Sequence, residues 1–267
     1  MRAALDQAGE LIAGAEAVMV CAGAGMGVDS GLPDFRGDEG FWRAYPPYQR
    51  LGLSFVELAD PVHFGSDPEL AWGFYGHRLA LYRATVPHSG FDILRGWGAR
   101  AFTSNVDGQF QKAGFTEVAE VHGSIHHLQC LLPCRSAIWP ADDVAIEVDP
   151  ETMRATGPLP ECPSCGALAR PNILMFGDYT WVPDRSQRDL DALASWRRSQ
   201  LGKRLVVVEI GAGNAIPTVR RQAELASAAT GALIRINPRE PEVRHGRGIS
   251  LPMPAAEALG EIQSRLG

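Results

Sequence analysis

Four cysteines in two pairs are the residues whose spacing points most directly to chemistry. Cys130 and Cys134 are separated by three residues, Cys162 and Cys165 by two, and 27 residues lie between the pairs. Two thiolate pairs at such spacings can close a tetrahedral site around zinc. We expect no export signal at the N-terminus, so metal is favoured over disulfides. The sequence therefore predicts a closed, structural zinc site.

The other residues near this framework are weaker candidates for metal binding. His126 and His127 precede the first pair and are competing ligands, but a site with four thiolates does not need them. Cys21 belongs to a predicted strand far from both pairs. We predict that its thiol is buried and inert.

A second chemical signal is the stretch 18–37, VMVCAGAGMGVDSGLPDFRG. An apolar run of strand length, 17–22, ends at Gly23, Ala24 and Gly25, where a tight turn could bring backbone N–H groups against a phosphate. Val28 stands where the dinucleotide fingerprint requires a third glycine, so the turn alone is equally compatible with a purely structural role.

Two loops extend this possible nucleotide site. The first places a carboxylate, an aromatic ring and a guanidinium side by side, in Asp34, Phe35 and Arg36. Loops on a rigid sheet often carry function. The second follows the apolar run 205–210 and predicts another phosphate or ribose turn, at Gly211, Ala212 and Gly213.

Polar residues also follow two further predicted strands. Asn105 and Asp107 come after the run 99–103 and could simply cap the next helix. His122 comes after the run 118–121, where a single histidine is usually a packing or hydrogen-bonding residue. Its near-neutral pKa would also suit a general base.

The segment between the first two strands predicts an insertion over the pocket. Residues 41–61 are rich in aromatics and prolines, typical of a mobile loop, whereas 66–87 predict a helix capped by Ser66 or Asp67, with Pro68 in its first turn. On this helix Tyr75 and Arg78 share a face and could together bind a carboxylate. The alternative is an ordinary helix surface, with the aromatic ring packed inward and the arginine solvated.

Apolar runs alternate with helical stretches along most of the chain. They lie at 17–22, 99–103, 118–121, 172–176, 205–210 and 232–236, between a first helix at 3–14 and a last one at 252–267. This alternation predicts an α/β fold with a mostly parallel, Rossmann-like sheet covered on both faces. Ligands bind beyond the carboxyl ends of such strands, where the polar residues lie.

Composition narrows the possible partners. The chain has 267 residues, 45% hydrophobic content and a net charge of −6, enough for one large domain with an insert. Without clustered Lys and Arg, nucleic acid is not expected as a partner. No apolar run is long enough to span a membrane, and residues 1–18 predict an amphipathic helix. We therefore expect a cytoplasmic protein that binds neither membranes nor nucleic acid.

The ordered motifs resemble those of one family. GAG followed by SGLPDFRG resembles the NAD-binding signature of the sirtuins, the NAD-dependent protein lysine deacylases. The strings NVD at 105–107, HGS at 122–124, RPNILMFGD at 170–178 and IN at 236–237 are also similar to sirtuin motifs. The resemblance implies NAD as co-substrate and the removal of acetyl, succinyl or malonyl groups from protein lysines. The products would be nicotinamide, free lysine and O-acyl-ADP-ribose.

The resemblance also implies roles for individual residues. His122 would be the general base, while Asn105 and Asp107 would orient NAD and the attacking water. The acyl-lysine peptide would add as a strand beside Ile173, Met175, Phe176 and Gly177. Tyr75 and Arg78 resemble the Tyr-x-x-Arg that binds the acyl carboxylate in sirtuins that remove succinyl and malonyl groups. Further NAD contacts are implied for Gly23, Ala24, Gly25, Asp34, Phe35, Arg36, Ser104, Gly211, Ala212, Gly213 and Asn237.

Several departures keep alternatives open. Ser104 stands where the family has Gln, Asp178 where it has Glu, and Ala212 and Gly213 where it has Thr and Ser. ADP-ribosyl transfer to a protein, or NAD hydrolysis, is therefore an alternative activity on the same fold. A zinc-stabilised sensor without turnover is disfavoured, because Asn105, Asp107 and His122 are present. No oligomeric state is predicted.

The predicted domain organisation follows from the same motifs. A Rossmann-like NAD-binding domain comprises 1–45, 88–125 and 171–267. Residues 46–87 form the cofactor loop and a helical insertion, and 126–170 form the zinc module.

Overall fold

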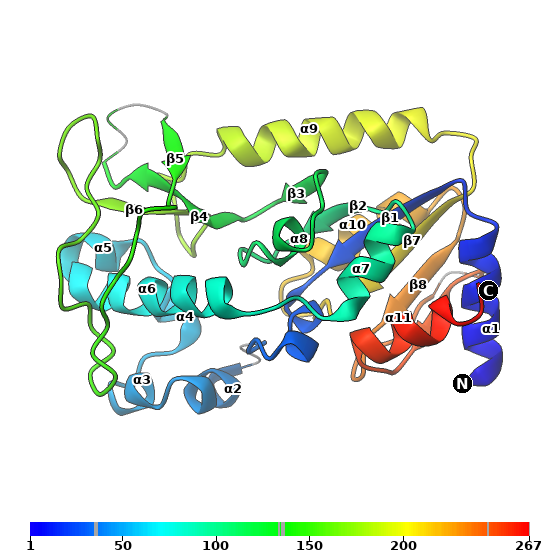
Figure 1. The fold of residues 1–267 in the computed structure, drawn as a ribbon, viewed down its shortest axis with the longest axis horizontal. Helices are drawn as coiled ribbons and strands as arrows, with labels where there is room; N and C mark the ends of the chain where they lie inside the picture. Colours follow the sequence, from blue (N-terminus) through cyan, green and yellow to red (C-terminus); the bar gives the residue numbers. More distant parts are fainter. Residues whose placement is uncertain (35–36, 133, 135–136, 245, 267) are drawn as a thin grey trace.

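A six-stranded parallel sheet forms one end of the molecule (Figure 1). The computed structural model describes residues 1–34, 37–132, 134, 137–244 and 246–266. The strand order is β3-β2-β1-β7-β8-β9, and every neighbouring pair is parallel. The Rossmann-like sheet predicted from the alternating pattern is therefore confirmed. Its strands are β1 (Ala17–Ala22), β2 (Arg100–Thr103), β3 (Val118–Glu120), β7 (Leu205–Ile210), β8 (Leu233–Ile236) and β9 (Ile249–Leu251).

Both faces of the sheet are covered, which is why its central strands are continuous apolar runs. Val20 and Val208 pack with α1 (Arg2–Ala13), α7 (Ser89–Gly96) and α11 (Ala255–Gln263) in one core. Met19 and Val207 point to the opposite face and pack with α9 (Asp184–Ser199) and α10 (Thr218–Ser227). The two termini lie close together at this end (Figure 1). Period-2 alternation of side chains therefore divides each strand between two cores.

The insertion is more ordered in secondary structure than predicted. The stretch expected to be a mobile loop contains short helices, and aromatic rings at Tyr45 and Tyr48 are buried against Phe74 at centroid distances of 5.6 and 5.8 Å. The short helices are held by packed aromatic rings and lack the long apolar stripe that usually indicates a helix. Hydrophobic periodicity therefore did not predict these helices. The helices are α2 (Gly37–Ala44), α3 (Pro46–Arg50), α4 (Phe55–Leu58), α5 (Val62–Ser66) and α6 (Pro68–Ala84).

The longest of these helices begins as predicted. The Asp67 side chain accepts a hydrogen bond from the Leu70 N–H, and Pro68 occupies the first turn. An N-cap carboxylate and a proline at this position both favour helix initiation. This start fixes the register of α6 and therefore the direction of Tyr75 and Arg78.

One predicted strand belongs to a different sheet. The strand expected at 172–176 is β6 (Ala169–Ile173), and it pairs antiparallel with β4 (Gly123–Cys130), which also pairs with β5 (Ile138–Pro140). Its assignment to the parallel sheet was wrong because an apolar run indicates burial but not which strand is its partner. The predicted domain boundaries themselves stay a prediction.

The remaining boundaries shift by a few residues at most elements. The last helix begins at Ala255 rather than 252, since Pro252 and Pro254 precede it. β9 and α8 (Gln109–Lys112) are too short to produce a clear pattern. None of the helices in the described ranges is long and apolar enough to cross a lipid bilayer.

A fully buried ion pair holds the chain where it leaves β6. Arg170 Nη2 lies 2.9 Å from Asp178 Oδ1, and both side chains have no exposed surface. The carboxylate also accepts the Thr180 N–H at 3.1 Å, while Arg170 Nη1 donates to the Ile173 carbonyl at 3.3 Å. The pair therefore closes the loop 174–180 onto the strand that precedes it.

We expect Asp178→Asn to destabilise the protein by about 3–5 kcal/mol, because the buried Arg170 charge would lose its counter-charge. The matched control is Asp92→Asn, which breaks the exposed Arg95–Asp92 pair at 3.3 Å and should change stability by less than about 1 kcal/mol. Urea unfolding of the three proteins measures both values. Equal effects at the two sites would contradict a special role for the buried pair.

Candidate functional site

Two glycine turns lie against each other at the carboxyl ends of β1 and β7. Gly23 N–H donates to the Ile210 carbonyl at 2.9 Å, and Gly25 N–H donates to the Gly211 carbonyl at 3.0 Å. A Cβ atom at Gly25 would lie 2.6 Å from Gly211 Cα, so neither turn tolerates a side chain there. Both N–H groups are thus used inside the protein rather than aimed at a phosphate. Ala24, which lies between these two glycines, is exposed.

The buried side chain of Asn237 holds the second turn in place. This side chain is fully buried, and its amide donates to the Ala212 carbonyl at 2.9 Å and accepts the N–H groups of Arg239 and Glu240. Asn237 therefore shapes the turn, and a direct ribose contact by it stays a prediction. Gly213 is partly exposed, and a Cβ atom there would meet only the Glu240 carboxylate, at 3.8 Å.

Asn105 is fixed beside the first turn by the end of β2. The Thr103 hydroxyl donates to the Ala22 carbonyl at 2.9 Å and accepts the Asn105 N–H at 3.0 Å. The Asn105 amide then donates to the Gly23 carbonyl at 3.0 Å. This geometry contradicts the capping alternative for Asn105, because its side chain bonds the turn and not the following helix. Ser104 lies between these residues, and its N–H donates to Ala22 at 3.3 Å.

Asp107 is a buried carboxylate at the start of α8. Its Oδ1 accepts the Gln109 N–H at 2.9 Å, so the predicted capping bond is present here. Burial raises the pKa of Asp107 to about 6, while the Gln109 hydrogen bond and the Arg78 charge act in the opposite direction. Asp107 is therefore a carboxylate that gains its proton only slightly below neutral pH.

His122 lies between the two sheets, immediately after β3. Its carbonyl accepts the Leu174 N–H at 2.9 Å, which ties it to the end of β6. Burial lowers the pKa of His122, and a contact with the Ser104 main chain acts in the opposite direction. The imidazole is therefore neutral at physiological pH, as a general base must be.

The loop after the first turn is described only in part. Asp34 is half-buried. Phe35 and Arg36, which the sequence analysis placed beside it, lie outside the described residues. Their predicted contacts with NAD stay predictions.

The predicted peptide-binding edge has a different exposed side chain from those expected. Ile173 and Met175 are buried in the aromatic core of the insertion, whereas Leu174 is 38% exposed. Phe176 N–H donates to the Ala59 carbonyl at 3.0 Å, and Gly177 has a φ of 65° that ends the extended segment. Alternation along a strand could have identified Leu174, had the register been known.

Tyr75 and Arg78 meet on α6, as their spacing predicts. The Arg78 guanidinium carbon lies 5.5 Å from the centre of the Tyr75 ring, and both side chains are buried. The alternative of a solvated arginine is therefore wrong. The guanidinium also bonds to the Tyr82 hydroxyl, a partner that sequence reasoning missed.

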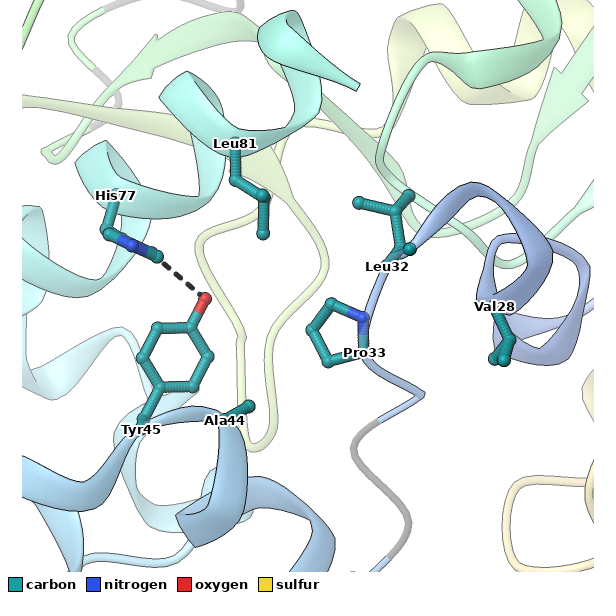
Figure 2. A pocket seen from close by; sticks show the side chains of 8 residues that line it. Val28, Leu32, Pro33, Ala44, Tyr45, His77 and Leu81 are labelled. Carbon is teal, nitrogen blue, oxygen red and sulfur yellow. Dashed lines mark hydrogen bonds between the residues drawn. The ribbon is translucent and has the colours of Figure 1, made fainter. Parts of the chain in front are cut away.

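A cavity of about 330 Å³ lies between the loop after the first turn and α6 (Figure 2). At its wall the Tyr45 hydroxyl lies 3.2 Å from His77 Nδ1, and Leu32 and Pro33 face them. The sequence analysis did not predict this cavity. The four-residue spacing of His77 and Leu81 places both side chains on one face of the predicted helix, but it does not show that a cavity lies beside that face. The other lining residues are Val28, Gly31 and Ala44.

The four predicted cysteine ligands gather at the far end of β4. All four sulfur atoms lie within 4.8 Å of one another, and neither His126 nor His127 joins them. Two of the Sγ···Sγ distances are 3.7 Å, close to the edge of about 3.8 Å of a tetrahedron with Zn–S bonds of 2.3 Å. The donor set therefore fits zinc. Cys21 is buried and distant from this cluster, and burial raises its pKa.

Known proteins resemble the chain over almost its whole length. "NAD-dependent protein deacylase 1" of Pseudomonas aeruginosa is 32% identical over 262 residues, 96% of each chain. "NAD-dependent protein deacylase" of Mycobacterium tuberculosis is 30% identical over 259 residues, 93% of this chain and 97% of that protein.

Solved structures agree with these relatives. A Sir2 homologue in complex with NAD has 26% identity and a TM-score of 0.71, covering 97% of this chain and 94% of that one. A mutant Sir2 homologue in complex with ADP-ribose has 27% identity and a TM-score of 0.73 over the same shares. The model of the Sir2 family matches residues 23–194. This chain therefore belongs to the Sir2 family, the sirtuins.

Proposed function

We propose that this protein removes acyl groups from protein lysines with consumption of NAD. The observation that carries the proposal is that Ala24, Asn105, Asp107 and His122 all follow the carboxyl ends of the neighbouring parallel strands β1, β2 and β3, where Asn105 bonds to Gly23 and His122 contacts the Ser104 main chain. Support comes from the hydrogen bonds that hold a glycine turn, the Asn105 amide and the Asp107 carboxylate beyond β1 and β2, and from the neutral imidazole that follows β3. The relatives named as NAD-dependent deacylases and the NAD complex of a Sir2 homologue support the same function.

Each side chain has a defined task in this reaction. Bound NAD supplies the ribose carbon that receives the acyl oxygen when nicotinamide leaves. Asn105, held by the Gly23 carbonyl, orients the ribose and a water molecule. Asp107 stabilises positive charge that develops beside it, because it is ionised above about pH 6. His122 accepts a proton from a ribose hydroxyl at its ring nitrogen.

Acidic acyl groups are the substrate class that the insertion favours. Burial raises the pKa of Tyr75 to about 12, so its phenol stays protonated and can donate a hydrogen bond. Arg78 provides a permanent charge within the same aromatic cluster. A succinyl or malonyl carboxylate would meet both groups. We therefore propose acyl-lysine proteins with acidic acyl groups as substrates, and acetyl-lysine as a poorer one.

The cellular setting follows from the thiolate cluster. Four cysteines that gather around a metal must stay reduced, which favours a reducing compartment such as the cytoplasm. The zinc cluster lies at the end of β4 that is remote from His122, so the metal would hold the small sheet together rather than take part in the reaction.

The first prediction is that His122→Ala lowers deacylation by 100-fold or more while NAD still binds, because only the base is removed. Mass spectrometry of an acyl-lysine peptide and calorimetric titration with NAD measure the two properties. Since the pKa of His122 is lowered and that of Asp107 is raised to about 6, wild-type turnover should fall at acidic pH, where the imidazole and the carboxylate both gain a proton. Unchanged turnover in the variant would remove His122 from the mechanism.

A second prediction concerns Arg78→Met. It should lower kcat/KM for succinyl- and malonyl-lysine peptides at least 10-fold, because the carboxylate loses its charged partner. Arg78 also lowers the pKa of Asp107, so the assay belongs at pH 8, where Asp107 is ionised in both proteins. Arg78→Lys is the control that keeps the charge.

The outcomes of this assay separate the activities. Removal of acetyl groups alone by wild-type protein would leave a deacylase and discard the acidic acyl class. Release of nicotinamide with every acyl group still in place would indicate ADP-ribosyl transfer or NAD hydrolysis instead.

A third prediction is that purified protein contains about one zinc ion per chain, and that Cys162→Ser loses it and unfolds at lower temperature. Elemental analysis and thermal unfolding measure the two effects. Cys21→Ala removes the remaining thiol and should keep the zinc. Metal-free protein from a preparation without chelators would contradict the site.

A further inference from the structure

We propose that Tyr82 is a positioning residue for acyl-group selection, which it exerts by holding the Arg78 guanidinium in a fixed plane. The inference rests on the proposed function, because it concerns how the acidic acyl group is recognised. It adds a residue that lies outside the Tyr-x-x-Arg pattern, one helical turn after Arg78.

The Arg78 guanidinium is bonded at one edge to a single oxygen. Nε–H and Nη2–H both donate to the Tyr82 hydroxyl, at 3.0 and 2.8 Å. Two hydrogen bonds to one atom fix the rotation of the guanidinium about its last bonds. A carboxylate then has to meet the group at another of its edges, since arginine has five N–H donors in a rigid fork. The Tyr82 hydroxyl oxygen therefore determines which edge of the Arg78 guanidinium would bind the acyl carboxylate.

Aromatic rings around the Arg78 guanidinium also restrict its position. The guanidinium carbon lies 5.1 Å from the centre of the Phe74 ring, 5.5 Å from that of Tyr75 and 5.4 Å from that of Tyr82. Cation–π attraction of this kind holds the position of a guanidinium but tolerates its rotation in the ring plane. The hydroxyl of Tyr82 adds a directional constraint, because it accepts two hydrogen bonds from the guanidinium.

The main chain of Tyr82 is itself held by Gln109, a neighbour of the proposed nucleotide-site residue Asp107. The Gln109 side chain donates to the Tyr82 carbonyl at 3.0 Å, while the Gln109 N–H donates to the Asp107 carboxylate at 2.9 Å. Gln109 is almost completely buried. One residue therefore links the carboxylate of the nucleotide site to the tyrosine that positions Arg78.

The Tyr82 phenol is a neutral partner of the Arg78 charge. The pKa of Tyr82 is raised by burial, and both the Arg78 and the Asp107 charges influence it. The hydroxyl therefore keeps its proton and remains a neutral acceptor toward Arg78. A neutral partner fixes Arg78 without cancelling its positive charge.

The test is Tyr82→Phe, which removes only the oxygen and keeps the ring. Steady-state kinetics would use one peptide carrying acetyl-, succinyl- or malonyl-lysine, with saturating NAD. We expect KM for the two acidic acyl groups to rise about 10-fold with kcat within about 3-fold, and both constants for acetyl-lysine to stay within about 3-fold. Tyr48→Phe is the matched control, because its equally buried hydroxyl donates to the Met153 carbonyl instead.

Three results would overturn the inference. Equal losses for all acyl groups would indicate a purely structural role for Tyr82, and an unchanged succinyl KM would indicate no role. If wild-type protein shows no preference for acidic acyl groups, the proposed substrate class fails, and the role of Tyr82 fails with it. In the first two cases the preference of wild-type protein stands, so the two failures are distinguishable.

Discussion

The backbone contact between the two glycine turns is the constraint on which the site depends. β1 and β7 are parallel neighbours, and Ala22 lies opposite Ile210, so both chains must turn at the same level. A Cβ atom at Gly211 would lie 2.4 Å from Gly25 Cα, and Gly211 has a φ of 62°. Only glycine satisfies both conditions. Asn105 and Asn237 then bond to carbonyls of these turns, so the positions of the polar groups are set by this contact.

The features that could be predicted from the sequence are those in which the residue type itself has few structural alternatives. Four thiols at metal-ligand spacing have few alternatives, and their sulfur atoms do gather. The central strands β1 and β7 are apolar except for Glu209 because both faces are buried, which made their existence and parallel direction predictable. The start of α6 was equally predictable, since Asp67 and Pro68 favour helix initiation through contacts with the neighbouring backbone. Local rules were therefore sufficient for these elements.

Features that depend on distant partners could not be predicted in the same way. The partner of β6 is set by the return of the chain around the cysteine module, which no local pattern encodes. The N–H groups of Gly23 and Gly25 suit a phosphate by motif, yet β7 and its turn accept both. Tyr82 shows the same limit, because its importance lies in a side-chain bond to Arg78 and not in its spacing from Tyr75.

In the proposed function, Arg78 and Asp107 would connect acyl selection with the chemistry of the nucleotide site. Both groups are buried, and interactions between charges are screened less in such surroundings than in water. The Arg78 charge lowers the pKa of Asp107, so a substitution that removes this charge alters the carboxylate as well as the acyl pocket. A change at Tyr82 removes a neutral oxygen and leaves both charges in place. Under the proposed function, acyl preference and turnover would therefore be separable at Tyr82 but electrostatically coupled at Arg78.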